Sequence, residues 1–183
     1  MAPVAPGLAE PTSIVRLAED WWSRGSDSPL AIAIGAAEGT RTPQGDKTPA
    51  YYWHRDPGNG ADNFGTFSYQ HLKAPTVAPV QQKSSTSAKR TAAAEAKLPE
   101  LADQLQLQRL KGFEAQLRQQ AQAKGMTLDL VELINGLDLA NQSEAAALSP
   151  WGYLDRLQQM RHRYPNNPSL QVLEARTWAY WSP

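Results

Sequence analysis

The chain of 183 residues contains no cysteine, which excludes disulfide bonds and thiolate chemistry. It also lacks a net charge, because 18 Lys and Arg residues balance 18 Asp and Glu residues. Without an excess of either sign, no overall field directs the protein to nucleic acid or to an anionic membrane surface. No stretch approaches the roughly 18 apolar residues of a membrane span. The length remains sufficient for one domain with a proper core.

Histidine is scarce, and His54, His71 and His162 do not have the spacing of metal ligands. We therefore expect neither a metal nor a cofactor. The N-terminal sequence MAPVAPGLAEPTS has no basic segment followed by an apolar one, so it does not resemble a secretory signal. The expectation is a protein made in the cytoplasm that reaches any external site of action by another route.

Composition divides the chain into four parts. Residues 1–11 are expected to be a flexible N-terminus, and residues 12–72 to form the helices and the small strand-and-loop lobe of a catalytic region. Residues 73–97 are poor in large apolar side chains and rich in Ser, Thr, Ala, Gln and Lys, which predicts an exposed linker or a loose loop, with a helix in its Ala-rich part as an alternative. Residues 98–183 are predicted to form a helical lobe.

Apolar periodicity and capping signals predict six helices. Their expected ranges are 12–23, 29–38, 98–124, 127–142, 151–163 and 168–181. Between residues 41 and 71, Gly, Pro, Asn and Asp separate short aromatic pieces, Ala50–Trp53 and Asn63–Tyr69, which is typical of turns that join short strands or irregular loops. The predicted fold class is therefore α+β and mainly α, with a small strand and loop lobe at about residues 40–72.

Glu38 is the most informative residue of the sequence. It ends the apolar run 30–37 and is followed directly by Gly39. A carboxyl group at the exit of a buried helix is partly dehydrated, which raises its pKa and suits a proton donor near neutral pH. Because the helix dipole disfavours a carboxylate at this end, the position favours a functional role over a solvated helix end.

Downstream of Glu38, the nineteen residues 51–69 contain six aromatic residues, a density that is consistent with one wall of a cleft. They are Tyr51, Tyr52, Trp53, Phe64, Phe67 and Tyr69. The segment from Gly65 to Gln70 adds a glycine, two small hydroxyl side chains and a glutamine on a predicted turn and strand.

This order of features resembles the lysozyme-like superfamily: a glutamate at a helix end, then Gly-Thr, then a small lobe that ends in a Gly-containing segment with Gln. The resemblance is to phage lambda-type lysozymes and lytic transglycosylases. Ala37-Glu38-Gly39-Thr40 takes the place of the Ser-Glu-Gly-Thr segment that carries the acid in the lambda type, and Gly65 and Gln70 match a segment that lines the cleft. The resemblance covers roughly residues 12–72, and residues 31–70 also resemble proteins of cyanobacteria and their phages.

The resemblance implies a lysozyme-like fold and cleavage of the β-1,4 bond between N-acetylmuramic acid and N-acetylglucosamine in peptidoglycan. Glu38 would protonate the oxygen of that bond, and a second carboxylate would activate water or stabilise the oxocarbenium-like centre. Of the acids in the small lobe, Asp46, Asp56 and Asp62, we favour Asp56, with Arg55 expected to keep it ionised. No second carboxylate follows Glu38 at the spacing found in T4-type lysozymes. A lytic transglycosylase needs no second carboxylate, because the muramyl 6-hydroxyl attacks internally.

The resemblance also implies sugar contacts in the small lobe. Aromatic rings would stack on sugar faces, and hydroxyl and amide groups would bond to hydroxyl or acetamido groups. The residues assigned to substrate binding are Thr40, Tyr51, Tyr52, Trp53, Gly65, Thr66, Phe67, Ser68, Tyr69 and Gln70.

Three classes of function fit these features. The first is a peptidoglycan-cleaving enzyme, either a phage endolysin or a virion-associated lysozyme, that acts in the periplasm or cell wall. The second is a glycan-binding module that has the cleft without turnover, and the third is a structural helical protein of a virion or scaffold. The segment 177–183 ends on an apolar aromatic face, for which we expect a neighbouring lobe, a virion or other protein partner, or an absent continuation of the polypeptide.

Overall fold

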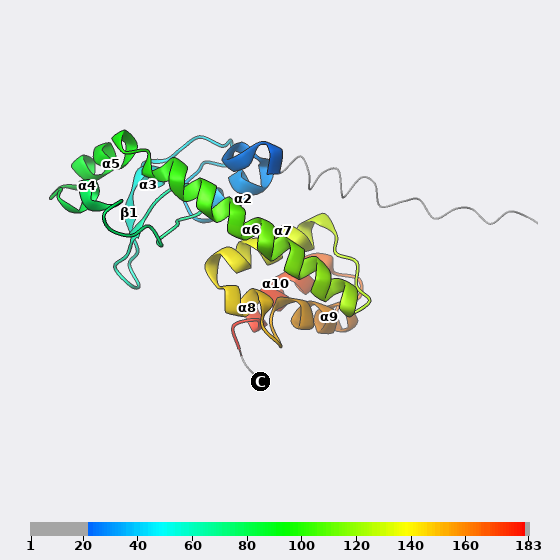
Figure 1. Cartoon of the computed structure of the whole chain (residues 1–183). Helices are drawn as coiled ribbons and strands as arrows, with labels where there is room; N and C mark the ends of the chain where they lie inside the picture. Colours follow the sequence, from blue (N-terminus) through cyan, green and yellow to red (C-terminus); the bar gives the residue numbers. More distant parts are fainter. Residues whose placement is uncertain (1–21, 182–183) are drawn as a thin grey trace, which may run out of the picture.

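The computed structural model describes residues 22–181, which form a mainly helical fold with a small two-stranded sheet. The long helix α6 (Leu98–Ala123) crosses the molecule and connects its two parts (Figure 1). One part contains α3 (Pro49–Tyr52), α4 (Ala78–Gln81), α5 (Thr86–Glu95) and the sheet. The other contains α7 (Leu130–Gln142), α8 (Glu144–Leu148), α9 (Tyr153–Arg163) and α10 (Pro168–Trp178). The predicted class, α+β and mainly helical, is confirmed at this level.

The four helices predicted after residue 98 are confirmed, with starts that differ by up to three residues. Asp129 caps α7 in a reciprocal arrangement, because its carboxylate accepts from the Glu132 N–H and the Glu132 carboxylate accepts from the Asp129 N–H, both at 2.9 Å. No helix within residues 22–181 is both long and apolar enough to cross a membrane. The helix predicted over 12–23 lies outside the described residues except for its last two positions, which are helical.

Helix α2 (Pro29–Ala37) begins and ends as the sequence predicts. The Ser28 hydroxyl accepts from the Ala31 N–H at 3.3 Å, and Pro29 occupies the first turn, where its missing N–H has no cost. The helix is not buried all round, since its buried side is formed by Leu30, Ala31, Ile34 and Gly35. Glu38 caps its C-terminus, and Gly39 follows with a φ of 72°.

The small lobe contains β1 (His54–Arg55) and β2 (Asp62–Asn63), which pair antiparallel with His54 opposite Asn63. The piece 50–53, expected as a strand or loop, is instead mostly the short helix α3. Its start is set by Thr48, whose hydroxyl accepts from the Ala50 N–H at 3.2 Å, and by Pro49 in the first turn.

The segment 73–97, expected as a linker or loose loop with a helix in its Ala-rich part as the alternative, contains α4 and α5, and α5 is that helix. Small apolar side chains are sufficient to hold it on the fold. Those buried are Val77, Val80, Ala92 and Ala93. Arg90 also donates from Nε to the Trp53 carbonyl oxygen at 3.2 Å, so α5 covers the small lobe.

The interior contains two hydrophobic clusters, and α6 contributes to both. Leu110 and Leu117 belong to the larger cluster, which joins α2 to α7–α10. Leu98 and Ala102, near the start of α6, belong to the smaller cluster with Trp53, Phe64 and the side chains of α4 and α5. The junction between the two clusters is where α2, the small lobe and α7 meet.

Candidate functional site

Glu38 lies at this junction. It is half-buried, and its Oε1 accepts a hydrogen bond of 3.1 Å from the Asn141 side chain near the end of α7. Burial is the largest influence on Glu38 and raises the pKa of its carboxyl group above the ordinary value. The Ser68 and Asn141 side chains and His54 lower this pKa in part, while the nearby negative charge of Asp138 adds to the rise. The carboxyl group is therefore set to hold its proton to a higher pH than a free glutamate.

The orientation of Asn141 is fixed by its other contacts. Its Oδ1 accepts from the Gln106 amide at 2.8 Å, so its Nδ2 must face the opposite way. This nitrogen donates both to Glu38 and to the Phe67 carbonyl oxygen, at 3.2 Å. One amide thereby holds together α2, α6, α7 and the loop that carries Phe67.

A cavity of about 410 Å³ opens beside the Glu38 carboxyl group. It is lined by side chains from the small lobe and from the end of α7. They are Glu38, His54, Asp56, Pro57, Asn63, Phe67, Ser68, Gln70, Asn141 and Gln142. Five of the residues assigned from the sequence, Glu38, Asp56, Phe67, Ser68 and Gln70, therefore lie at one cavity.

The pKa of Asp56 shifts in the opposite direction from that of Glu38. Its Oδ1 accepts from the backbone N–H groups of Asn59 and Gly58, at 3.1 and 2.7 Å, and these bonds lower the pKa of the carboxyl group. The expected influence of Arg55 is not among the causes of this shift. The two carboxyl groups at this cavity therefore have pKa values shifted in opposite directions, that of Asp56 downward by its own turn and that of Glu38 upward by burial.

His54 and Asn63, which lie opposite each other in the sheet, line the same cavity as these two acids. The Nδ1 of His54 lies 2.9 Å from the Ala50 carbonyl oxygen, which can only accept, so this nitrogen carries a hydrogen. In the neutral ring Nε2 is then an acceptor, and the Asn63 amide donates to it at 3.3 Å. The side-chain oxygen of Asn63 is left buried with no hydrogen-bond partner.

A second unpartnered polar atom at the cavity is the Ser68 hydroxyl oxygen. It lies close enough to favour ionised Glu38, yet it makes no hydrogen bond of normal geometry. The Ser68 backbone has a φ of 53°, a left-handed conformation that is costly for a residue other than glycine. Native proteins rarely bury polar atoms without partners. The free Asn63 and Ser68 oxygens are groups that a polar ligand in the cavity would satisfy.

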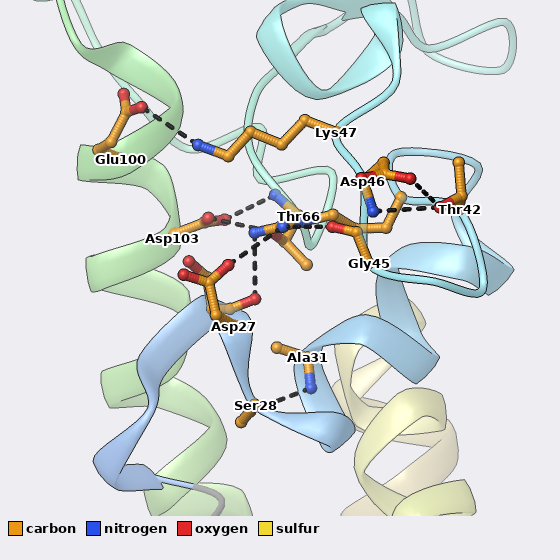
Figure 2. A network of polar contacts seen from close by, with 12 residues as sticks. Asp27, Ser28, Ala31, Thr42, Gly45, Asp46, Lys47, Thr66, Glu100 and Asp103 are labelled. Atoms are coloured by element: carbon orange, nitrogen blue, oxygen red, sulfur yellow. Dashed lines mark hydrogen bonds and ion pairs between the residues drawn. The ribbon is translucent and has the colours of Figure 1, made fainter.

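The loop that carries Ser68 is held in place by the buried carboxylate of Asp103, which bonds to Thr66. Asp103 of α6 accepts from the Thr66 N–H at 2.6 Å and from the Thr66 hydroxyl at 3.0 Å (Figure 2). The Nε of Arg41 donates to the same hydroxyl at 3.1 Å, and its guanidinium group also reaches Asp27. Burial raises the pKa of Asp103, and these contacts lower it in part. Gly65 has a φ of 77° and so close an approach to α6 that a Cβ atom would lie 2.5 Å from Asp103 Oδ1.

Several residues assigned to sugar binding lie in this supporting structure instead of at the cavity. Thr40 and Thr66 are fully buried, and the Thr40 hydroxyl faces the carbonyl oxygens of Gly35 and Thr66. Tyr51 is buried between Arg41 and Lys47, whose charged groups lie 5.2 and 4.2 Å from its ring centre.

Three further aromatic residues are also absent from the cavity wall in the described part of the chain. Trp53 is only 6% exposed, because α5 covers it and the Lys89 ammonium lies 4.6 Å from its ring centre. Tyr52 packs edge-to-face on Tyr51. Tyr69 borders a smaller hollow of about 30 Å³ that shares Ser68 and Gln70 with the cavity.

Four polar residues of the cavity were not assigned from the sequence: His54, Asn63, Asn141 and Gln142. His54 and Asn63 belong to segments already singled out for aromatic and turn residues. No local pattern marks Asn141 or Gln142, which lie at the end of a helix more than 100 positions after Glu38.

Larger hollows exist at two other places on the described chain, of about 550 and 560 Å³. The first is lined by Trp151, Lys124 and Asp155, and the second by residues of α4 and α5. Each contains one carboxylate, and neither contains an unpartnered buried oxygen. We therefore take the cavity at Glu38 as the candidate site.

Among residues 22–181, no group of three or more His, Asp or Glu side chains is arranged to hold a metal ion. The chemistry available at the cavity is that of one carboxyl group with a raised pKa, one with a lowered pKa, and several amide and hydroxyl groups. Comparison with protein-family models, curated proteins and solved structures finds no match to this chain.

Proposed function

We propose that this protein cleaves the glycan strands of peptidoglycan, with Glu38 as the general acid. The observation that carries the proposal is the pair of carboxyl groups at one cavity whose pKa values shift in opposite directions. Glycoside hydrolysis uses such a pair, one acid protonated and one ionised. The resemblance of residues 12–72 to lambda-type lysozymes and lytic transglycosylases supplies the substrate class.

In the hydrolytic route, Glu38 transfers its proton to the oxygen of the β-1,4 bond as the bond from C1 to that oxygen breaks. The Asp56 carboxylate stabilises the positive charge that develops at C1, or takes a proton from the water that attacks there. The unpartnered Asn63 and Ser68 oxygens accept from hydroxyl or acetamido N–H groups of the sugar.

The transglycosylase route is a second candidate, favoured by one observation. Asp56 Oδ1 already accepts two backbone N–H groups of its own turn, so this oxygen has a structural use. In that route the 6-hydroxyl of the muramyl ring attacks C1, Glu38 serves first as acid and then as base, and the product is a 1,6-anhydro sugar. Mass spectrometry of released fragments separates the routes, because hydrolysis leaves reducing ends.

The decisive experiment is Glu38→Gln, assayed by the release of soluble fragments from purified peptidoglycan. We expect cleavage to fall by at least about a hundredfold, since the amide cannot donate a proton as an acid does. Glu95→Gln is the matched control, because Glu95 is an exposed glutamate of α5 away from the cavity. Equal activity of Glu38→Gln and the unaltered chain would disprove the proposal.

The binding of peptidoglycan by the same variants distinguishes the other interpretations. Binding without cleavage by the unaltered chain would indicate a glycan-binding module. Neither binding nor cleavage would leave a structural helical protein. As an enzyme of this substrate, the protein would act at the cell wall, either released as an endolysin or carried on a virion.

A further inference from the structure

An exposed aromatic segment follows α10 and lies beside the Glu38 cavity. The Tyr180 hydroxyl donates a hydrogen bond of 3.2 Å to Oε1 of Gln142, and Gln142 lines the cavity. Burial of the hydroxyl end raises the pKa of Tyr180, and the charges of Asp138 and Glu38 contribute to that rise against the opposing charge of Arg176. The Tyr180 hydroxyl therefore lies within the electrostatic reach of Glu38, although 55% of the residue surface is exposed.

The backbone of this segment is held in place while its rings stay exposed. Ala179 is buried, the Trp181 N–H donates to the Trp178 carbonyl oxygen at 3.1 Å, and Arg156 donates to the Trp181 carbonyl oxygen at 2.7 Å. Trp178 and Trp181 are nevertheless 44% and 65% exposed. Large aromatic surfaces that are ordered and exposed together mark an interaction site.

The surroundings of Tyr180 favour a sugar over the apolar core of a protein interface. Its ring offers an apolar face, and its hydroxyl bonds to Gln142. Gln142 lines the cavity and also bonds to Asp138. A sugar ring matches this arrangement, because it has an apolar face and a polar rim. The centre of a protein interface is depleted of charged groups and does not match this arrangement.

We propose that Tyr180, together with Gln142, forms a sugar-binding site for the part of a glycan strand that extends beyond the cavity. The site makes affinity depend on strand length, because only a strand that reaches past the cavity meets the Tyr180 ring. This inference takes its ligand from the proposed function, but it requires binding and no turnover.

The test uses the full chain carrying Glu38→Gln, so that ligands are not cleaved. Calorimetry measures the binding of N-acetylglucosamine–N-acetylmuramic acid oligomers of two, four and six sugars. We expect Tyr180→Ala to weaken the binding of the longest oligomer by about five- to tenfold and to leave the shortest unchanged. Tyr180→Phe keeps the ring face and should retain most of the affinity.

Trp151→Ala is the matched control, since Trp151 is 52% exposed and borders a different hollow. It should bind every oligomer as the parent does. If Tyr180→Ala does not fold, Gln142→Ala tests the same site, with a loss that again grows with oligomer length. Circular dichroism of each variant separates loss of binding from loss of fold.

The outcomes separate this inference from the proposed function. A length-dependent loss with Tyr180→Ala supports the site even if Glu38 proves to have no part in cleavage. Cleavage that depends on Glu38, combined with unchanged binding of all oligomers by Tyr180→Ala, overturns the sugar site alone and makes a protein partner the better occupant. If the Glu38→Gln chain with Tyr180 intact binds no oligomer of any length, the sugar site is overturned, and the cleavage assay alone decides the proposed function.

Discussion

Asn141 donates a hydrogen bond of 3.1 Å to Glu38 although the two residues are 103 positions apart in the chain. The bond connects the end of α7 to the end of α2, and the same amide nitrogen also holds the Phe67 carbonyl oxygen. The acid of the candidate site is therefore positioned by a side chain from a helix that lies far along the chain.

Replacing Asn141 with Ala should change both the rate of cleavage and its pH dependence. The bond from Asn141 lowers the pKa of Glu38, so its removal raises that pKa further. The basic limb of the pH–rate profile, which reports deprotonation of the acid, should move to higher pH. The maximal rate should fall by about tenfold, because the carboxyl group is less well oriented. A profile with an unmoved basic limb would contradict this role.

Glu38→Gln should stabilise the fold near neutral pH. The pKa of Glu38 is raised in the folded state, so the folded protein binds the proton more tightly than the unfolded chain does. Its contribution to stability is present below the unfolded pKa and is lost as the pH rises through the folded pKa. Removing the charge should therefore add up to about 1 kcal/mol near pH 7 and little below about pH 4. Thermal denaturation of the variant and parent at both pH values measures this difference.

Asp56→Asn distinguishes the two chemical routes. The amide oxygen can still accept from Gly58 and Asn59, so the turn is expected to persist. In the hydrolytic route the loss of the ionised group should reduce the rate by about a hundredfold or more, whereas the transglycosylase route should lose less than about tenfold. The rate and the end groups of the fragments are measured on the same digest. A hydrolase with full activity in this variant would exclude Asp56 as the second acid.

Gly65→Ala should destabilise the fold strongly. A Cβ atom at this position would lie 2.5 Å from Asp103 Oδ1 and 2.8 Å from the Pro99 carbonyl oxygen, and the φ of 77° is itself unfavourable for alanine. We expect a loss of about 2–4 kcal/mol in the free energy of unfolding. Gly39→Ala is the control, since Gly39 has a φ of 72° but no atom within 4 Å of the added Cβ. It should lose only about 1 kcal/mol, and equal losses in urea titrations would disprove the close-contact argument.

The sequence predicted the helical parts well where periodicity and capping agree. Helix α2 begins at its Ser-Pro signal, and the helices from α6 onward follow the apolar spacing. The same kind of signal, Thr48-Pro49, starts α3, although the aromatic residues that follow it are typical of a strand or loop. In residues 73–97 the small side chains of α5 gave little hydrophobic signal, yet they are buried because the small lobe lies against them.

Local sequence also singled out residues that the fold brings together, since Glu38, Asp56 and Ser68 lie at one cavity. It could not separate rings that face the cavity from rings such as Tyr51 and Trp53, which are buried by residues of other segments. Nor could it identify Asn141, whose contact with Glu38 exists only because α7 packs beside α2. Such long-range contacts depend on the tertiary arrangement and leave no periodic signal.

Helix α6 has a consequence for how this molecule responds to damage. Because its side chains belong to both hydrophobic clusters, melting of either end removes packing from the other. The two parts should therefore denature together in one cooperative transition, and neither should survive as a stable proteolytic fragment.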